Sequence, residues 1–176
     1  IKSKSSHAEN IGAINCVNIQ KNNKGINTDW VGYLNSIKEH KINKSQKIII
    51  LGYGGASKAI LYGLLHKGFQ NVLVFNRTKK LVKHKEKKFF TKQYNKFNKH
   101  VTNVSLLINT TPINPLSRIQ STLVDKNVLV SDIVYKPMNT NFLKSFKGHK
   151  KIYGISMLIE QARPCFYEWF GFKPMV

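Results

Sequence analysis

The sequence predicts an α/β fold whose main part is a doubly wound parallel sheet. The first observation is the run from Ile48 to Leu51, which is β-branched and apolar throughout, as in a parallel strand buried on both faces. The second is that glycines and then a helical pattern follow this run directly. The third is that similar runs of strand length recur along the chain, at residues 72–75, 105–109, 128–134 and 151–153.

The turn after the first of these strands has the composition of a dinucleotide-binding loop. Gly52, Gly54 and Gly55 let the backbone turn sharply, and they leave no Cβ in the way of a pyrophosphate. The next helix has small and apolar residues at helical spacing, so one face can pack on the sheet while the N-terminal N–H groups point at phosphates. This is the pattern of a Rossmann-type βαβ unit. Taken alone, it also fits a tight βα turn in an unrelated α/β domain.

The residues after the second strand indicate which dinucleotide binds. A site for NAD usually has Asp or Glu about 20 residues beyond the glycines, where it accepts a hydrogen bond from the ribose 2′-OH. This chain instead has Asn76, Arg77 and Thr78, followed by Lys79 and Lys80. A guanidinium suits a 2′-phosphate, so the expected cofactor is NADP. If the turn bound no nucleotide, Arg77 would be an ordinary solvated charge.

The composition limits the classes of protein to consider. Of 176 residues, 41% are hydrophobic, which is enough for a folded core. The net charge of +21 raises the question of a nucleic-acid partner. The lysines are interleaved with asparagine and isoleucine along the whole chain, as AT-rich codon usage would produce, and we favour that explanation. No apolar run approaches the roughly 20 residues of a membrane span and no signal peptide is visible, so we expect a cytoplasmic protein without a membrane partner.

Neither the cysteines nor the histidines indicate a metal site. Cys16 and Cys165 are far apart in sequence and have no metal-binding or redox spacing. We therefore expect buried thiols in a reducing compartment rather than a disulfide. The six histidines are scattered and form no pair at ligand spacing, so we expect no metal.

Several further elements follow from local patterns. A strand is expected over residues 13–19, with a turn at 21–24. Thr28 or Asp29 can serve as the N-cap of the next helix. Because the chain opens at Ile1 with no earlier element to pair with, we expect it to be the interior of a longer protein. Two more helices are expected, over 140–146 and 154–170.

The lysine-rich segment from 79 to 103 is expected to contain a helix and a weakly marked strand. Its charges suggest a solvated face, and its aromatic residues suggest the side that packs. Aromatic residues among lysines also suit single-stranded nucleic acid, which is the less favoured interpretation. The aromatic residues are Phe89, Phe90, Tyr94 and Phe97.

Seven segments, in order, resemble motifs of the shikimate dehydrogenase family. They are IGAINC (11–16), GINTDWVG (25–32), LGYGGASKA (51–59), NRT (76–78), INTTP (108–112), DIVYKPMNT (132–140) and GISMLIEQARPCFYEWFG (154–171). The series covers nearly all of the chain and is far more specific than any one motif. The resemblance implies an oxidoreductase that reduces 3-dehydroshikimate to shikimate with NADPH, in the biosynthesis of chorismate and the aromatic amino acids.

The resemblance also implies which residues act on the substrate. In the family, a lysine beside an aspartate supplies a proton as hydride reaches the carbonyl carbon. The aspartate corresponds to Asp29, which is the expected catalytic residue. The lysine's own motif, N-V-T-x-P-x-K, would lie upstream of Ile1, so we expect this chain alone to bind cofactor with little or no turnover. The expected substrate contacts are Asn15, Asp29 and Gln161, with Thr28 and Tyr135 as second choices.

The cofactor contacts implied by the resemblance fall into three groups. The glycine loop would hold the pyrophosphate with Gly52, Gly54, Gly55, Ala56 and Ser57. The basic turn would surround the 2′-phosphate with Asn76, Arg77, Thr78 and Lys80. Thr110 and Pro112 would border the nicotinamide half, and Gly154 its amide.

The resemblance divides the chain into four parts and leaves two alternatives. Residues 1–28 would be a remnant of the substrate-binding domain, 29–43 a linking helix, 44–153 the NADP-binding domain, and 154–176 a helix returning to the substrate-binding domain. The two flanks should therefore meet in space. One alternative is a quinate/shikimate dehydrogenase, and the other is a basic module that binds nucleotide or nucleic acid without catalysis. A small-molecule substrate is the expected partner, and a homodimer stays open.

Overall fold

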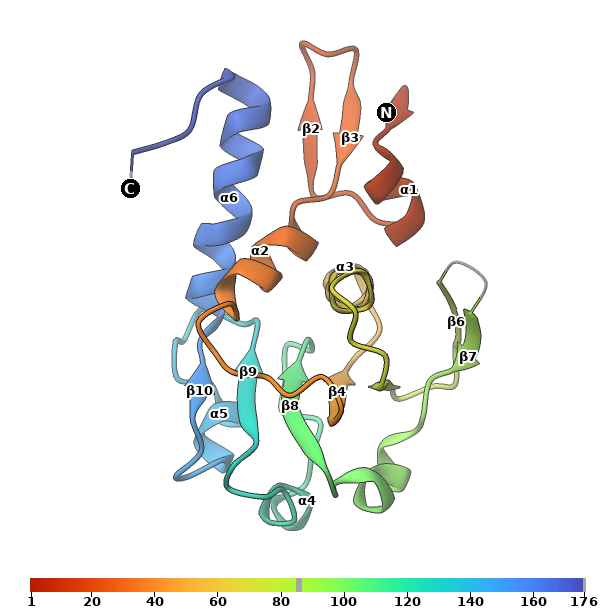
Figure 1. Cartoon of the computed structure of the whole chain (residues 1–176), viewed down its shortest axis with the longest axis vertical. Coiled ribbons are helices and arrows are strands. Elements are labelled where there is room, and N and C mark those ends of the chain that lie inside the picture. Colours follow the sequence, from red (N-terminus) through yellow and green to blue (C-terminus); the bar gives the residue numbers. More distant parts are fainter. Residues whose placement is uncertain (85–86, 176) are drawn as a thin grey trace.

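The main part of the molecule is a five-stranded parallel sheet (Figure 1). The computed structural model describes residues 1–84 and 87–175, and the strand order is β10-β9-β8-β4-β5. The chain moves from β4 to β5 on one side and then crosses to β8, β9 and β10 on the other, which confirms the doubly wound topology. The strands are β4 (Lys47–Leu51), β5 (Val72–Phe75), β8 (Val104–Asn109), β9 (Leu129–Asp132) and β10 (Lys151–Ile152).

Helices cover both faces of this sheet, which confirms the α/β class. Ile48 and Ile50 of β4 pack into one core cluster, and Ile49 and Leu51 into the other. The first face is covered by α2 (Asp29–Ser36) and α3 (Gly55–His66). The second is covered by the 3₁₀ helix η1 (Tyr94–His100), α4 (Arg118–Thr122) and α5 (Asn141–Ser145). None of the described helices is long and apolar enough to cross a membrane.

Side-chain caps begin several of the short helices. The Thr140 hydroxyl accepts from the Leu143 N–H at the start of α5, and Ser117 with Gln120 forms a capping box at α4. Thr28 occupies the N-cap of α2, as expected, but its side chain makes no capping hydrogen bond. Its hydroxyl lies instead among polar side chains from other elements, which are described below with the site.

A small second sheet lies at the other end of the molecule (Figure 1). Its order is β1-β3-β2, with β1 parallel and β2 antiparallel to β3. The helix α6 (Gly154–Phe170) runs from the five-stranded sheet toward this end. The segment over 13–19 thus forms a shorter strand than expected. The elements are β1 (Ser3–Lys4), α1 (Ser6–Ile11), β2 (Cys16–Asn18) and β3 (Lys24–Ile26).

The two flanks of the chain meet, as expected, because β2 lies beside α6. The Trp169 indole N–H donates to the Val17 carbonyl at 2.9 Å. The Asn18 side-chain amide donates to the Glu168 backbone carbonyl, and Lys21 forms an ion pair with the Glu168 carboxylate at 3.2 Å. These contacts bring together residues about 150 positions apart in the chain.

The expectation of free thiols is wrong, because Cys16 and Cys165 form a disulfide. Their Cα atoms are 6.1 Å apart, within the range that a disulfide spans. Both residues are buried, at 2% and 5% exposure. The sequence spacing of the cysteines does not indicate this pairing, because the two residues are 149 positions apart and meet only through the tertiary contact between β2 and α6.

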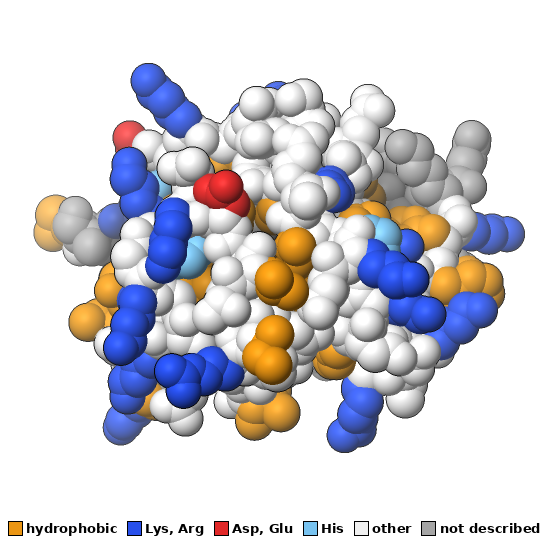
Figure 2. Space-filling model, turned by 90° about the horizontal axis from the view of Figure 1, so that it is seen from below, with side chains coloured by type: hydrophobic (Ala, Val, Ile, Leu, Met, Phe, Trp, Pro, Cys, Tyr) orange, Lys and Arg blue, Asp and Glu red, His pale blue; other side chains and the backbone are white. Residues whose placement is uncertain are grey.

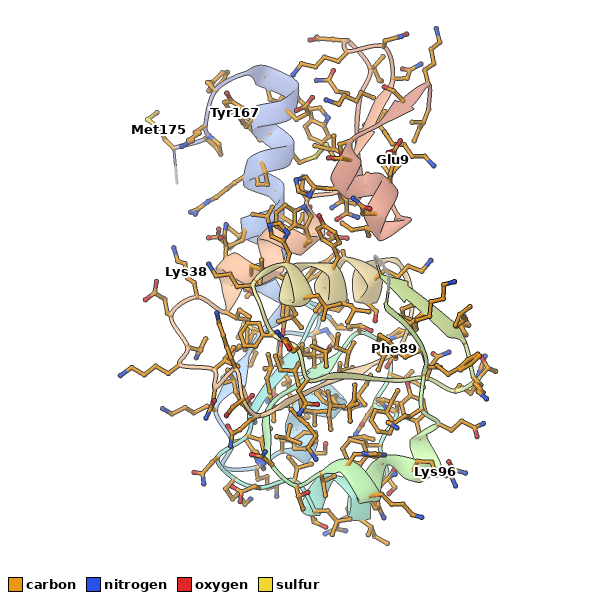
Figure 3. All side chains as sticks on the ribbon, turned by 45° about the vertical axis from the view of Figure 1, so that its right-hand side comes forward. Glu9, Lys38, Phe89, Lys96, Tyr167 and Met175 are labelled. Atoms are coloured by element: carbon orange, nitrogen blue, oxygen red, sulfur yellow. A yellow bond between two sulfur atoms is a disulfide. The ribbon has the colours of Figure 1, made fainter. Side chains whose placement is uncertain are left out.

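The segment after the basic turn is also different from its prediction. It forms an antiparallel pair, β6 (Leu81–His84) and β7 (Lys87–Phe90), followed by η1, where a helix was expected. Leu81 pairs with Phe90 and Val82 with Phe89, and such apolar and aromatic cross-strand pairs favour a sheet. Lysines three and four residues apart would repel one another on a helix. Phe89 packs against the core near α3 (Figure 3). Phe90 is exposed.

Candidate active site

The glycine loop makes a tight turn at the carboxyl end of β4, where only glycine fits. Gly52 has φ of +101°, and a Cβ there would lie 2.6 Å from the Thr110 hydroxyl. The Ser57 hydroxyl donates to the Gly52 carbonyl at 2.8 Å, and Ser57 is fully buried. Ser57 therefore fixes the loop with its side chain and can offer a ligand only its backbone N–H.

The loop leaves space and N–H donors for an anionic group. A Cβ at Gly54 would meet no atom within 4 Å, and one at Gly55 would meet only the Ala13 side chain at 3.7 Å. Helix α3 begins at Gly55, and its first hydrogen bond is donated by Lys58 to the Gly54 carbonyl. The N–H groups of residues 55–57 thus have no acceptor within the helix. Open space above free N–H groups at a helix N-terminus fits a pyrophosphate.

The basic turn after β5 is already ordered by its own side chains. The Asn76 amide donates to the Thr78 carbonyl at 3.0 Å. The Thr91 hydroxyl donates to the same carbonyl at 3.2 Å and accepts from the Lys80 N–H at 2.9 Å. Arg77, Thr78 and Lys80 are exposed, so their side chains can reach a ligand at this edge.

Lys79 is placed differently from its two basic neighbours. Its ammonium lies 4.4 Å from the centre of the Phe90 ring, as in a cation–π contact. That contact joins the turn to β7. Arg77 and Lys80 are thus the basic side chains of the turn that remain available to a ligand.

Tyr94 is a residue of this edge that the sequence patterns did not indicate. It belongs to η1, and its hydroxyl lies against the Gly52 backbone and near the Arg77 charge. Burial raises the pKa of Tyr94, while the Gly52 contact and Arg77 act in the opposite direction. The sequence assigned Tyr94 only to packing, because its place beside the glycine loop depends on the unpredicted strand pair before it.

The carboxyl ends of β8 and β9 are joined by a buried polar network. The Asp132 carboxylate accepts from the Thr140 hydroxyl at 2.6 Å, the Val134 N–H at 3.0 Å and the Asn109 amide at 3.3 Å. Burial raises the pKa of Asp132, and these three hydrogen bonds lower it. Thr110 hydrogen-bonds the Leu51 carbonyl with its hydroxyl, at 2.7 Å, and Pro112 is exposed in the following turn. The network fixes the edge that borders the cavity described next.

A cavity of about 260 Å³ lies between α2, the start of α3 and α6. Three polar side chains line it, from Asn15, Asp29 and Gln161. Its apolar part consists of Ile133, Met157 and Leu158, which the sequence patterns did not single out. Ala56, Tyr135 and Gly154 complete the lining. Ala56 of the glycine loop therefore shares one cavity with the polar residues Asn15, Asp29 and Gln161, called the substrate group below.

The polar side chains of the cavity hydrogen-bond one another through Asn15. Its amide nitrogen donates to Asp29 Oδ1 at 2.7 Å and to Thr28 Oγ1 at 2.9 Å, and it lies 3.3 Å from Gln161 Oε1. The Asn15 carbonyl oxygen accepts from the Thr28 N–H at 2.8 Å. Four residues named from the sequence are thus brought together from three separate segments. Their donors and acceptors suit a ligand that carries several hydroxyl groups.

Asp29 is partly buried, and this sets its acidity. Desolvation raises the pKa of the Asp29 carboxyl, and the Asn15 hydrogen bond lowers it by less, so the net shift is upward. Among the residues that line the cavity in the described part of the chain, none is a lysine. Nor do the described residues include three or more His, Cys, Asp or Glu arranged to hold a metal ion.

Gly154 and Tyr135 lie at the far side of the cavity. Gly154 starts α6 against the backbone of Ile133 and Val134, and a Cβ there would lie 2.6 Å from the Val134 carbonyl oxygen. Only glycine allows this close approach. Tyr135 is 52% exposed, which leaves its ring accessible at the cavity rim.

A comparison with protein families identifies the group to which these features belong. The family model described as Shikimate / quinate 5-dehydrogenase matches residues 36–135, more than half of the chain. The chain belongs to this family. Because the match ends before Gln161 and begins after Asn15, the segments on either side rest on the comparisons that follow.

Relatives of the shikimate dehydrogenase family match nearly the whole chain. A shikimate dehydrogenase (NADP(+)) of Caldanaerobacter subterraneus is 36% identical over 93% of this chain and 64% of its own length. One from Methanosphaera stadtmanae is 35% identical over 95% of this chain and 65% of its own. The chain therefore spans slightly less than two thirds of the length of these curated relatives.

Solved shikimate dehydrogenases have the same fold. The Aquifex aeolicus enzyme is 30% identical, with a TM-score of 0.82 over 99% of this chain and 68% of that one. The Thermus thermophilus enzyme, solved in complex with NADP(H) and shikimate, is 27% identical, with a TM-score of 0.77 over 99% of this chain and 69% of that one. The likeness extends through both flanks and so includes the segments that carry Asn15 and Gln161.

Proposed function

We propose that this chain provides the NADP-binding domain and part of the substrate site of an NADP-dependent shikimate dehydrogenase, which interconverts 3-dehydroshikimate and shikimate. The observation that carries the proposal is that Asn15, Asp29 and Gln161 line one cavity with Ala56 of the glycine loop, while the buried Thr28 hydrogen-bonds Asn15 behind them. The hydroxyl groups of a polyhydroxylated ring in this cavity would replace the hydrogen bonds that these side chains now make with one another. Membership of the family and the names of the relatives support the same substrate.

NADP is the cofactor that the chain's own residues fit. The free N–H groups of residues 55–57 would hold the pyrophosphate, and Arg77 with Thr78 and Lys80 would hold the 2′-phosphate. The turn over residues 76–80 has no carboxylate that would accept a hydrogen bond from a ribose 2′-OH. When bound, NADPH supplies the hydride that the carbonyl carbon receives.

The chain's residues orient the substrate and prepare it for proton transfer. Asp29 would accept a hydrogen bond from a ring hydroxyl, while Asn15 and Gln161 offer side-chain amides to neighbouring hydroxyls. Tyr135 at the rim would contact the carboxylate side. The carbonyl oxygen needs a proton as the hydride arrives, and no described residue that lines the cavity is a lysine. We therefore propose that the chain alone binds both ligands but turns them over little or not at all.

The same proposal assigns roles to the parts of the chain. Residues 44–153 would bind NADP, and residues 1–28 and 154–176 would belong to the substrate-binding part, with 29–43 linking the two. Thr110 and Pro112 would border the nicotinamide, and Gly154 its amide group. We also propose a cytoplasmic location. Whether the protein forms a homodimer is a question for experiment.

Calorimetric titration of the chain with NADP, NAD and shikimate tests the proposal. NADP should bind more tightly than NAD, and shikimate should bind to the NADP-loaded chain. Gln161→Leu should weaken shikimate binding about tenfold, because it removes the side-chain amide that would hydrogen-bond a ring hydroxyl. Gln93→Leu is a matched control, since Gln93 is exposed and makes no side-chain cap. Failure of both NADP and shikimate to bind would contradict the proposal.

Three further measurements separate the alternatives. Turnover of quinate with NAD would favour a quinate/shikimate dehydrogenase. Salt-sensitive binding of an oligonucleotide that NADP fails to displace would favour the basic module. Robust NADPH-dependent reduction of 3-dehydroshikimate by the chain alone would show that an acid within these residues suffices.

A further inference from the structure

The Cys16–Cys165 disulfide lies directly behind the substrate group. Cys16 follows Asn15 in sequence, and Cys165 is four residues, about one helical turn, beyond Gln161. Asn15 and Gln161 are themselves in contact, with 3.3 Å between the side-chain nitrogen and oxygen. Moving away from the cavity, the disulfide is the next contact after Asn15–Gln161 between this N-terminal segment and α6.

The remaining connections form a series along β2 and α6. Val17 accepts from the Trp169 indole, and Asn18 and Lys21 both contact Glu168. Their order along the chain places the Asn15–Gln161 contact at the cavity end and the Glu168 contacts at the other. The disulfide is the covalent member of the series, and it lies next to the Asn15–Gln161 contact at the cavity end.

Two noncovalent members of this series are exposed, whereas Asn18, which hydrogen-bonds the Glu168 carbonyl at the end away from the cavity, is buried. Trp169 is 46% exposed, and the Lys21 side chain of the ion pair is 60% exposed. Solvent-exposed ion pairs contribute little to stability, because water and salt screen them. Without the covalent link, the Asn18 hydrogen bond would still join β2 to α6 at the far end. At the cavity end, Asn15 would be joined to α6 only by its 3.3 Å hydrogen bond to Gln161.

We propose that Cys16 and Cys165 are positioning residues whose disulfide fixes Asn15 against Gln161 for substrate binding, and that reduction of this disulfide weakens the binding of shikimate. This inference rests on the proposed function of the cavity.

The redox step is an exchange with a dithiol. A thiolate of the dithiol attacks one sulfur, the Cys16–Cys165 bond breaks, and the second thiol of the reagent displaces the protein sulfur. The protein gains two electrons and two protons and ends with two thiols, while the dithiol becomes a disulfide. Because both cysteines are buried, the exchange requires the end of α6 to open first.

The first measurement establishes the link itself. The chain, purified without reductant, is alkylated, digested and analysed by mass spectrometry. We expect peptides that contain Cys16 and Cys165 to be found cross-linked, and to separate after treatment with dithiothreitol. Complete alkylation of both cysteines in the unreduced, denatured protein would overturn the proposal.

The second measurement tests positioning. Shikimate and NADP are titrated separately into the oxidised chain, the dithiothreitol-reduced chain, and the variants Cys16→Ser, Cys165→Ser and Cys16→Thr. Reduction should weaken shikimate binding by roughly three- to tenfold, because side chains must then be ordered on binding, and NADP affinity should stay the same. Each variant should resemble the reduced chain and should not respond to dithiothreitol.

The outcomes distinguish this inference from the proposed function. Equal shikimate affinity in the oxidised and reduced chain would overturn the positioning role and leave the proposed function intact. Loss of both NADP and shikimate binding in every redox state would overturn the proposed function, and the positioning role with it. The reduced wild-type chain carries no substitution, so a folding defect in a variant cannot decide the result.

Discussion

In the proposed function, Arg77 contacts the 2′-phosphate by which NADP differs from NAD. It is exposed, it follows the last residues of β5, and Asn76 and Thr91 have already ordered the turn around it. Replacement by serine removes the guanidinium and leaves the turn intact. Because hydrogen bonds to charged groups contribute about 1.5–3 kcal/mol, Arg77→Ser should weaken NADP binding by roughly ten- to a hundredfold and leave NAD binding almost unchanged. Calorimetric titration with each dinucleotide measures the difference.

Lys79 offers a matched control for Arg77. Its ammonium faces the Phe90 ring, so Lys79→Ser removes a cation of the same turn that is committed to β7. We expect NADP affinity to change less than threefold, since an exposed cation–π contact contributes only about 0.5–1 kcal/mol. If Lys79→Ser weakened NADP binding as much as Arg77→Ser, the general charge of the turn and not the guanidinium fork would hold the phosphate.

Asp29 links the site to the stability of the fold. Its pKa is raised by burial above the ordinary value of 3.8, so the folded chain binds a proton more readily than the unfolded chain. The ionised carboxylate therefore lowers the free energy of unfolding at neutral pH, and this loss is absent once the pH falls below the unfolded pKa. Asp29→Asn should thus be more stable than the wild type at pH 7, with a difference that shrinks toward pH 4.

The same variant should lose substrate binding. A neutral amide accepts a weaker hydrogen bond from a ring hydroxyl than an ionised carboxylate does, so shikimate affinity should fall about tenfold. Urea unfolding at both pH values and titration with shikimate measure the two effects. A variant that is less stable at pH 7 would mean that the Asn15 hydrogen bond outweighs the cost of burying the charge.

At the scale of elements, the crossing of α2 and α6 sets the position of Gln161. A Cβ at Gly32 would lie 2.5 Å from Gln161 Cβ and 2.7 Å from its backbone nitrogen. Gly32→Ala must therefore push the two helices apart, at about 1–3 kcal/mol, as overpacking usually costs. We expect weaker shikimate binding and unchanged NADP binding, because the glycine loop lies on another element.

Gly54→Ala should have the complementary effect. A Cβ there meets no atom of the protein, so stability should stay within about 0.5 kcal/mol of the wild type, as for changes that disturb no contact. The methyl group would occupy the space above the free N–H groups of α3, so NADP binding should be lost while shikimate binding is retained. Thermal unfolding and titration of both variants test the pair. Equal loss of both ligands in each variant would contradict this separation.

Local sequence patterns determined most of the elements. The helix expected over 154–170 has the observed bounds Gly154–Phe170, and the buried run at 48–51 is the core of β4. The pair β6 and β7 was missed because its evidence is the pairing of Val82 with Phe89, which depends on register and not on periodicity. The lysines around Val82 and Phe89 interrupt the alternation of apolar and polar residues from which a strand is predicted.

At the scale of the whole molecule, the site depends on contacts that no local pattern contains. Asn15, Asp29 and Gln161 could be named only through the family motifs, since each alone is an ordinary polar residue. Their meeting in one cavity, and the meeting of Cys16 with Cys165, follow from how α6 crosses α2 and returns to β2. The spacing of the cysteines in the sequence does not indicate this tertiary contact, so the disulfide could not be predicted from it.

The charge of the whole molecule affects its stability more than any one ion pair. The net charge is +21, and Figure 2 shows Lys and Arg side chains spread over one face with few acidic groups between them. In the part of the chain that the structure describes, the ion pairs Lys21–Glu168 and Arg163–Glu160 join acids to bases. The remaining cations repel one another, and this repulsion destabilises the compact state.

Salt should therefore raise the melting temperature. Between about 0.01 and 0.15 M ionic strength the Debye length falls from about 30 to about 8 Å, which screens most of the repulsion between exposed charges. Each kcal/mol of repulsion that is screened should raise Tm by about 2–4 °C for a chain of this size. Lys96 is exposed on η1 (Figure 3), so Lys96→Gln should raise Tm at low salt and have little effect at 0.15 M, whereas Lys96→Arg should have no effect at either. Calorimetric scans measure this, and a Tm that falls as salt is added would mean that attractive pairs, and not repulsion, dominate the electrostatics of the folded chain.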